Sequence, residues 1–178
     1  MSLFFFGGIH GAGKSTLCEA LKGPLDAVHL RASDLIGYVA EPGDLMRKAV
    51  VDVGANQELA LSALTPYLTS SLTILLDGHY CLVRRDASIV NVPLDVFTSI
   101  RPLGLVLVEA PTFLVKQRLE RREGSSEYQI EFLTRLTQVE RQQAEFVSSS
   151  LNVPLKIWRH GMRKSSVLTF ARRLLVNA

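Results

Sequence analysis

Residues 8–16, Gly-Ile-His-Gly-Ala-Gly-Lys-Ser-Thr, match the pattern G-x-x-x-x-G-K-[ST] at every fixed position. In this pattern the glycines let successive backbone N–H groups turn inward around a phosphate chain. The lysine, here Lys14, reaches the terminal phosphate oxygens, and the Ser15 hydroxyl is a ligand for Mg²⁺. A helix N-terminus behind the loop adds its positive dipole. We therefore predict a nucleotide-phosphate site made of Gly8, His10, Gly11, Ala12, Gly13, Lys14, Ser15 and Thr16.

A carboxylate follows an apolar run further along the chain, where Leu72–Leu76 ends in Asp77. A buried strand that ends in an acid is the layout of a Walker B element, whose carboxylate lies beside the phosphate loop and orients Mg²⁺. An aspartate at a strand end is also a common turn or cap residue. The phosphate loop favours the metal site, so Ser15 and Asp77 are the predicted metal ligands, and Lys14 and Asp77 are predicted to be catalytic.

Arginines follow the segment Glu109–Pro111, in a polar stretch that carries Arg118, Arg121 and Arg122. Arg118 and Arg122 are one helical turn apart and share a face. In phosphoryl transfer one such guanidinium can stack on a purine or hold phosphate while the other stabilises charge on the transferring group. The alternative is a solvated helix end, where arginine suits the dipole. We favour the catalytic interpretation because a short glycine-containing lid candidate, residues 121–128, follows.

Alternating apolar runs and helical patterns indicate how these groups are positioned. Five runs are predicted as strands, namely Leu3–Phe6, Ala27–Arg31, Leu72–Leu76, Leu105–Val108 and Leu155–Trp158. Their near-continuous apolarity indicates burial on both faces. Helices are predicted between them, including Thr16–Lys22 and a long one over 127–148. The apolar face of the long helix is predicted to carry Tyr128, Phe132, Leu136, Val139 and Phe146. The pattern predicts an α/β fold, a three-layer sandwich with a parallel sheet and helices on both faces.

Composition limits the class of protein. The chain has 178 residues, of which 47% are hydrophobic, and this suits one domain over residues 1–178. Its net charge is +3, with basic residues gathered in the last third, where an anionic substrate could bind; a nucleic-acid partner is not required. Two cysteines without metal-ligand spacing argue against zinc and suggest reduced thiols in a cytoplasmic protein. No segment has the length of a membrane span or the form of a signal peptide.

Five segments, 8–16, 44–48, 76–79, 108–111 and 118–122, resemble in order and spacing the archaeal-type adenylate kinases and their bacterial relatives. The resemblance extends over roughly residues 4–161. It implies the P-loop nucleoside-monophosphate kinase fold with a five-stranded parallel sheet, and transfer of the γ-phosphoryl group of Mg-ATP to a nucleotide acceptor. It also implies that Arg47 meets the acceptor phosphate, that Arg118 and Arg122 contact the ATP base and the transferring phosphate, and that Arg141 is a lid-helix arginine.

The acceptor side departs from that family. The family's Asp-Thr-His reads Asp77-Gly78-His79, and residues 81–93 replace a tyrosine- and glycine-rich acceptor segment. His10 and His79 could act as a base or contact an acceptor phosphate, although completing a hydrogen-bond network is the favoured interpretation. The predicted substrate-binding residues are Arg31, Asp34, Arg47, Gln57, His79 and Arg141, and Arg118 and His160 are predicted on the ATP side.

Positive residues on both donor and acceptor sides favour a kinase that acts on a nucleotide or nucleoside, with ATP and Mg²⁺ as cofactors. Two alternatives remain open at this point. One is a regulatory module that binds ATP and hydrolyses it slowly. The other is a kinase for a non-nucleotide acceptor or an RNA 5′-hydroxyl. Acceptor pockets in this superfamily are built from loops with no transferable code, so the sequence does not name the acceptor.

Overall fold

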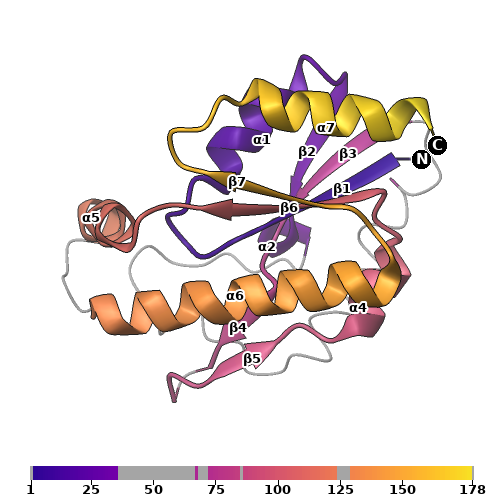
Figure 1. Ribbon diagram of the computed structural model, residues 1–178. Coiled ribbons are helices and arrows are strands. Elements are labelled where there is room, and N and C mark those ends of the chain that lie inside the picture. Colours follow the sequence, from indigo (N-terminus) through magenta and orange to yellow (C-terminus); the bar gives the residue numbers. More distant parts are fainter. Residues whose placement is uncertain (1, 36–66, 68–71, 85, 124–128, 178) are drawn as a thin grey trace.

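The computed structural model describes residues 2–35, 67, 72–84, 86–123 and 129–177, and the structural statements below concern these residues. A central sheet lies between two layers of helices (Figure 1). No helix in these ranges is long and apolar enough to cross a bilayer.

The central sheet has five strands in the order β2-β3-β1-β6-β7, and every neighbouring pair is parallel. The strands are β1 (Ser2–Gly7), β2 (Ala27–Arg31), β3 (Thr73–Asp77), β6 (Gly104–Glu109) and β7 (Leu155–Arg159). Each end lies within one residue of its prediction, so the predicted five-stranded parallel sheet is confirmed. All residues of β6 are buried, as expected for a strand covered on both faces.

The side chains of β1 alternate between the two hydrophobic layers. Phe4 and Phe6 pack in the core beneath α1 (Lys14–Lys22) and α7 (Ser165–Val176). Leu3 and Phe5 face the opposite way, into the core shared with the helices of the other face. Because successive strand residues point to opposite faces, one apolar strand anchors both layers.

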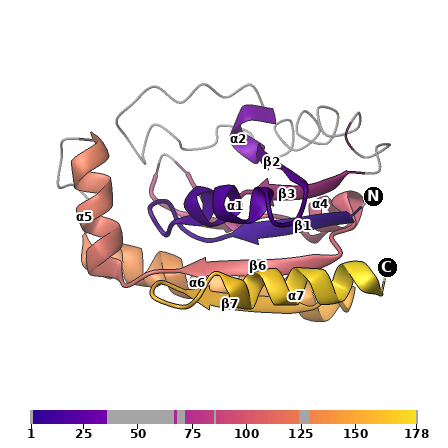
Figure 2. The same ribbon diagram turned by 90° about the horizontal axis from the view of Figure 1, so that it is seen from above.

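The other face is covered by α4 (Leu94–Ile100) and α6 (Ile130–Leu151), while α5 (Thr112–Glu123) stands at one end of the sheet and α2 (Ala32–Leu35) follows β2 (Figures 1 and 2). The long helix α6 begins and ends three residues later than the predicted 127–148. The prediction of its apolar face was partly wrong. Phe146 is 52% exposed. The polar Glu140 and Gln143 are buried instead, because their polar groups bond to backbone that the helix covers.

A small antiparallel hairpin, β4 (Cys81–Val83) and β5 (Ile89–Asn91), occupies the segment 81–93 that departs from the adenylate kinases. It lies against α6 (Figure 1). The sequence analysis did not predict it, because three-residue strands carry almost no periodic signal.

The phosphate loop follows β1, the middle strand: the chain leaves β1 through α1 toward β2 on one side of it, and leaves β3 toward β6 on the other side. The carboxyl ends of parallel strands at such a switch point are the usual place for a ligand in an open α/β sheet. Asp77 and Glu109 end the two flanking strands. The fold thus brings the loop and two acids to one edge.

Candidate functional site

The phosphate loop depends on glycine at two points in particular. A Cβ on Gly8 would collide with the carbonyl oxygen of Val108 in β6. Gly13, immediately before α1, has φ +107°, in the region that side chains other than glycine rarely adopt. The loop therefore passes close to β6 and enters α1 with its amides at the helix N-terminus. Within the loop, the side chain of Ala12 is buried, whereas Thr16 is exposed in the first turn of α1.

Lys14 is folded against its own loop. Its ammonium donates hydrogen bonds to the carbonyl oxygens of Gly8 at 2.8 Å and of Ile9 at 3.2 Å. Burial lowers the pKa of Lys14, while the carboxylates of Asp77 and Glu140 act in the opposite direction. The ammonium therefore sits at the loop's centre, where a phosphate would supply the negative charge that it needs.

The two predicted metal ligands meet. The Ser15 hydroxyl donates a 2.6 Å hydrogen bond to Oδ2 of Asp77, which is 7% exposed. Burial alone would raise the pKa of Asp77, but His29, Lys14 and Ser15 outweigh burial and lower it. An ionised carboxylate beside a hydroxyl is a hard-oxygen pair of the kind Mg²⁺ prefers, so these residues fit the predicted metal. No group of three or more His, Cys, Asp or Glu in the described ranges could hold a metal ion by itself.

His29 supports Asp77 from behind and was missed by the sequence analysis. Its Nε2 lies 3.5 Å from Oδ2 of Asp77, and its Nδ1 lies 2.8 Å from Oε1 of Glu19. Nε2 is buried without a hydrogen bond among the described residues, so its contact with Asp77 is electrostatic. The carboxylates of Asp77 and Glu19 raise the pKa of His29 despite its burial. The available signal was a histidine within the apolar strand Ala27–Arg31.

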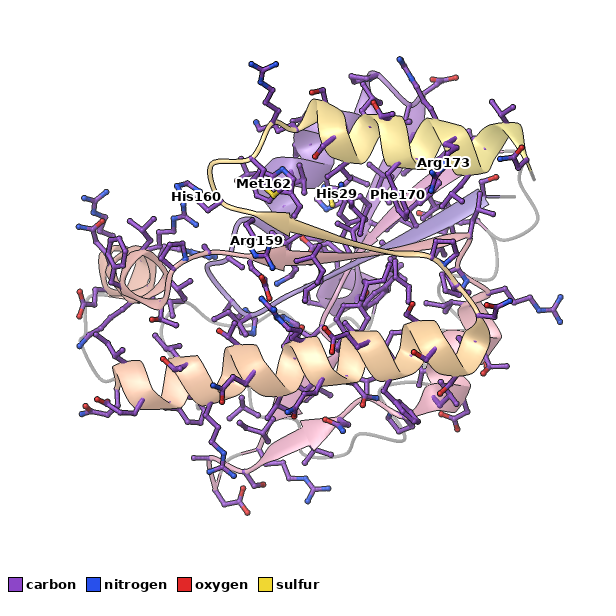
Figure 3. The ribbon with its side chains drawn as sticks, viewed as in Figure 1. His29, Arg159, His160, Met162, Phe170 and Arg173 are labelled. Carbon is purple, nitrogen blue, oxygen red and sulfur yellow. The ribbon has the colours of Figure 1, made fainter. Side chains whose placement is uncertain are left out.

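Arg118 and His160, both predicted on the ATP side, come together over the loop. Arg118 reaches from α5 and donates to the carbonyl oxygen of Gly11 at 2.8 Å. Its Nη2 lies 3.3 Å from Nδ1 of His160. His160 directly follows the end of β7, and Figure 3 labels it there. Arg122 is exposed in the last turn of α5, and makes no such contact with the loop among the described residues. Arg118 thus contacts the phosphate loop directly, whereas Arg122 is exposed and its charge acts on Lys14.

Arg141, predicted to contact substrate, forms a bidentate ion pair with Glu109 at the end of β6. Its Nε lies 2.8 Å from Oε1 and its Nη2 lies 2.7 Å from Oε2 of Glu109. Arg159 of β7 adds a contact of 3.3 Å to the same carboxylate. In this structure Arg141 is thus engaged with the sheet edge, and its predicted substrate contact remains a prediction.

The acceptor-side residues are only partly described. Arg31 pairs in register with Asp77, and Asp34 lies nearby on α2; both are exposed. The rings of His10 and His79 pack with their centroids 4.2 Å apart. The other predicted acceptor residues, Arg47 and Gln57, lie outside the described residues, as does most of the lid candidate 121–128, of which 121–123 end α5.

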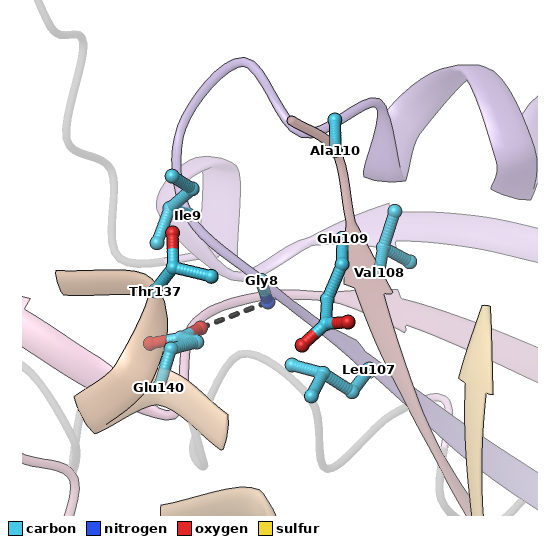
Figure 4. Close-up of a pocket in the computed structure, with 8 residues that line it drawn as sticks. All are labelled: Gly8, Ile9, Leu107, Val108, Glu109, Ala110, Thr137 and Glu140. Carbon is cyan, nitrogen blue, oxygen red and sulfur yellow. Dashed lines mark hydrogen bonds between the residues drawn. The ribbon is translucent and has the colours of Figure 1, made fainter. Parts of the chain in front are cut away.

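A second residue missed by the sequence analysis is Glu140 of α6, which is 1% exposed. Its Oε1 accepts a 2.8 Å hydrogen bond from the Gly8 amide, drawn in Figure 4. It lines a pocket together with Thr137, with Gly8 and Ile9 of the phosphate loop, and with the end of β6. An acidic residue in an amphipathic helix is usually exposed to solvent. The only sequence signal for burial of Glu140 was an interruption of the apolar spacing along this helix.

Both cysteines, Cys18 and Cys81, are free and buried. Burial raises the pKa of both thiols. They therefore persist as protonated thiols at neutral pH and are poor nucleophiles.

Comparison with known proteins agrees with this geometry. No curated protein matches the chain. Among solved structures, a gluconokinase from Sinorhizobium meliloti 1021 is similar over 99% of this chain and 92% of its own, with a TM-score of 0.57 and 16% identity. An uncharacterized protein from Eubacterium ventriosum ATCC 27560 is similar over 100% of both chains, with a TM-score of 0.54 and 8% identity. At these identities the likeness concerns the fold.

The amino-acid sequence itself matches the family described as AAA domain over residues 7–133, which include the phosphate loop, Asp77 and α5. These matches do not single out the adenylate kinases among proteins with this loop. The chain belongs to the AAA domain family.

Proposed function

We propose that the protein is an ATP- and Mg²⁺-dependent phosphotransferase that moves the γ-phosphoryl group of ATP to a small-molecule acceptor. The observation that carries the proposal is the hydrogen bond between Ser15 and Asp77 beside Lys14. It joins a phosphate-binding loop to a metal-binding carboxylate, and phosphoryl transfer depends mainly on positioning and charge neutralisation of this kind.

On the donor side, the loop amides and Lys14 would bind the phosphates, and Arg118 with His160 would flank the nucleotide. Ser15 and Asp77 would hold Mg²⁺, which would neutralise charge on the phosphate oxygens. The charge of Arg122, at the exposed end of α5, acts on Lys14, so its guanidinium is the candidate for stabilising charge on the transferring group.

On the acceptor side, Arg31 and Asp34 lie at the edge that Asp77 occupies. A guanidinium suits an anionic acceptor, and a carboxylate can accept a hydrogen bond or proton from a hydroxyl. A module that only bound and hydrolysed ATP would not need this pair. The pair therefore favours a kinase over a regulatory ATPase.

Two acceptor classes have separate support. The resemblance of residues 4–161 to adenylate kinases favours a nucleotide or nucleoside. The structural likeness to a protein described as a gluconokinase favours a hydroxylated sugar acid. In both classes the nucleophile is a hydroxyl or phosphate oxygen, and the rest of the acceptor molecule is anionic or polar.

The test is an acceptor screen. The protein is incubated with Mg-ATP and panels of nucleoside monophosphates, nucleosides, sugar acids and a 5′-hydroxyl RNA oligonucleotide, and ADP and phosphorylated products are measured by mass. We expect one acceptor class to raise ADP formation well above the rate without acceptor, and Lys14→Ala to abolish the increase. ADP formation that no acceptor stimulates would contradict the kinase and favour the slow ATPase.

A further inference from the structure

The carboxylate of Glu140 connects three segments that are far apart in the sequence. It accepts hydrogen bonds from the backbone amides of Gly8 at 2.8 Å, Tyr80 at 2.9 Å and Cys81 at 2.8 Å. The Cys81 thiol donates to the same group at 2.7 Å. Gly8 begins the phosphate loop, whereas Tyr80 lies in the turn that follows Asp77 and Cys81 begins β4. One side chain from α6 thus joins both sides of the site.

This arrangement is unusual for a core position beside an anion-binding loop. Burying a carboxylate costs free energy unless its lone pairs are satisfied, and here backbone donors satisfy them. Burial raises the pKa of Glu140, and its hydrogen bonds and the Lys14 charge oppose that shift. A negative charge near the loop would also repel a nucleotide's phosphates. An apolar side chain would pack there without that repulsion, but it would leave the amides of Gly8, Tyr80 and Cys81 without this acceptor.

We propose that Glu140 is a positioning residue whose carboxylate holds the Gly8 amide and so sets the start of the phosphate loop for nucleotide binding. The link continues to Lys14, because its ammonium is bonded to the carbonyl oxygens of Gly8 and Ile9. A loop that is free to rotate at Gly8 would carry those carbonyls, and the ammonium with them, away from the phosphate position.

The bonds to Tyr80 and Cys81 extend this role to the metal side. Asp77 ends β3 only three residues before Tyr80, and its carboxylate must stay within reach of Ser15. By bonding to the loop and to this turn together, Glu140 holds the two backbone segments in one relative position. The inference rests on the nucleotide-binding role of the loop and not on the identity of any acceptor.

The sign of a substitution effect separates positioning from electrostatics. Glu140→Gln keeps the side chain's volume but removes its charge and one acceptor. If the charge were the main influence, its removal would leave ATP affinity unchanged or strengthen it, because repulsion of the phosphates would fall. If the carboxylate positions Gly8, ATP affinity falls in spite of that electrostatic gain.

Gln143 provides the matched control. It is buried on the same helix, 5% exposed, and its Nε2 donates 2.8 Å to the carbonyl oxygen of Val92, without touching the loop. Gln143→Leu therefore removes a buried polar bond between α6 and the hairpin region only. Both variants are expected to lower the melting temperature, since each leaves buried backbone groups unsatisfied.

The experiment measures the Kd of Mg-ATP by calorimetry, without any acceptor, together with the melting temperature of each variant. We expect Glu140→Gln to raise Kd by about tenfold or more and Gln143→Leu to leave it within about twofold. An unchanged or lower Kd in Glu140→Gln, or an equal rise in both variants, would overturn the proposal. Because no acceptor is present, a negative acceptor screen leaves this result intact, and the two failures are distinguishable.

A measurement on the wild-type chain covers the case in which Glu140→Gln does not fold. The amide signals of Gly8, Tyr80 and Cys81 are followed by nuclear magnetic resonance as the pH is changed. We expect one shared midpoint, because all three amides donate to the same carboxylate. Among the described residues, the other ionisable groups that act on it or share its pocket are Lys14, His79, the Tyr80 phenol, the Cys81 thiol and Glu109. The midpoint should therefore persist in His79→Gln. A Gly8 signal that does not move with the other two would overturn the proposal.

Discussion

Ser15 and Asp77 are joined by a 2.6 Å hydrogen bond from hydroxyl to carboxylate, although 61 residues separate them in the chain. Ser15 lies in the first turn of α1 and Asp77 is the last residue of β3. The parallel pairing of β1 with β3 brings these two ends to the same edge of the sheet. The donor-side chemistry therefore depends on backbone pairing as well as on the phosphate loop.

Replacing Lys14 with alanine should abolish tight ATP binding, because its ammonium is the one charge at the centre of the loop that backbone amides cannot replace. We expect Kd to rise by two or more orders of magnitude, measured by calorimetry with Mg-ATP. Lys22→Ala, in the exposed last turn of the same helix, is the control and should bind as the wild type does. Undiminished ATP binding by Lys14→Ala would refute the phosphate-loop assignment.

Asp77→Asn should leave nucleotide binding without Mg²⁺ largely intact but suppress Mg²⁺-dependent turnover. The amide keeps the size of the side chain and can still accept from Ser15, but it loses the charge that orients the metal. Turnover is measured over a range of Mg²⁺ concentrations, with Asp95→Asn, an exposed residue in the first turn of α4, as control. If Asp77→Asn changes neither the rate nor the Mg²⁺ dependence, Asp77 is a strand cap.

Arg118→Ala and Arg122→Ala should affect different kinetic constants. Arg118 bonds to the loop carbonyl of Gly11, so its loss should weaken ATP binding already in the ground state. Arg122 makes no such bond, and its loss should chiefly lower kcat, since charge on the transferring group develops in the transition state. Steady-state kinetics with ATP varied distinguish the two. Arg121→Ala provides a control on the same exposed turn, and wild-type kinetics in both variants would contradict a role for Arg118 and Arg122 in binding ATP or in catalysis.

His29→Gln should destabilise the protein most at low pH. The pKa of His29 is raised in the folded state from its ordinary value of 6.5, chiefly by Asp77 and then by Glu19. Its contribution to stability is therefore fully present below about pH 6.5 and is lost as the pH rises through the folded-state pKa. Melting temperatures from pH 5.5 to 9 should show a wild-type advantage that shrinks with pH. Glu19→Gln should weaken this trend, and a difference independent of pH would contradict it.

Arg47 lies outside the described residues, and its role stays a prediction. If it meets an acceptor phosphate, Arg47→Ala should raise the KM for a nucleoside monophosphate by about one to two decades while ATP binding stays nearly unchanged, as the loss of a charge-assisted hydrogen bond would require. Both constants are measured on the acceptor found in the screen. Equal weakening of ATP and acceptor would count against the nucleotide-kinase interpretation.

Local pattern was enough to predict the architecture and the donor loop. Near-continuous apolar runs predict strands covered on both faces, and the spacing of Gly8–Thr16 predicts the phosphate loop, because both depend on residues adjacent in the chain. The strand that ends in Asp77 could be interpreted as a metal-binding element from the sequence, because the phosphate loop had already been recognised. For Arg118 and His160, the sequence analysis predicted that both lie on the ATP side. It did not predict that they contact each other.

Tertiary structure alone decided which polar residues are buried and what they bond. Glu140 and His29 carry only a weak local signal, and none that names their partners, because those partners are backbone amides and carboxylates that the sheet brings from distant segments. Phe146 fits an apolar helical face by spacing, yet it is exposed. Hydrophobic periodicity identifies an element, but the direction in which each side chain points depends on the rotation of that element against its neighbours. That rotation is set by packing across the whole fold.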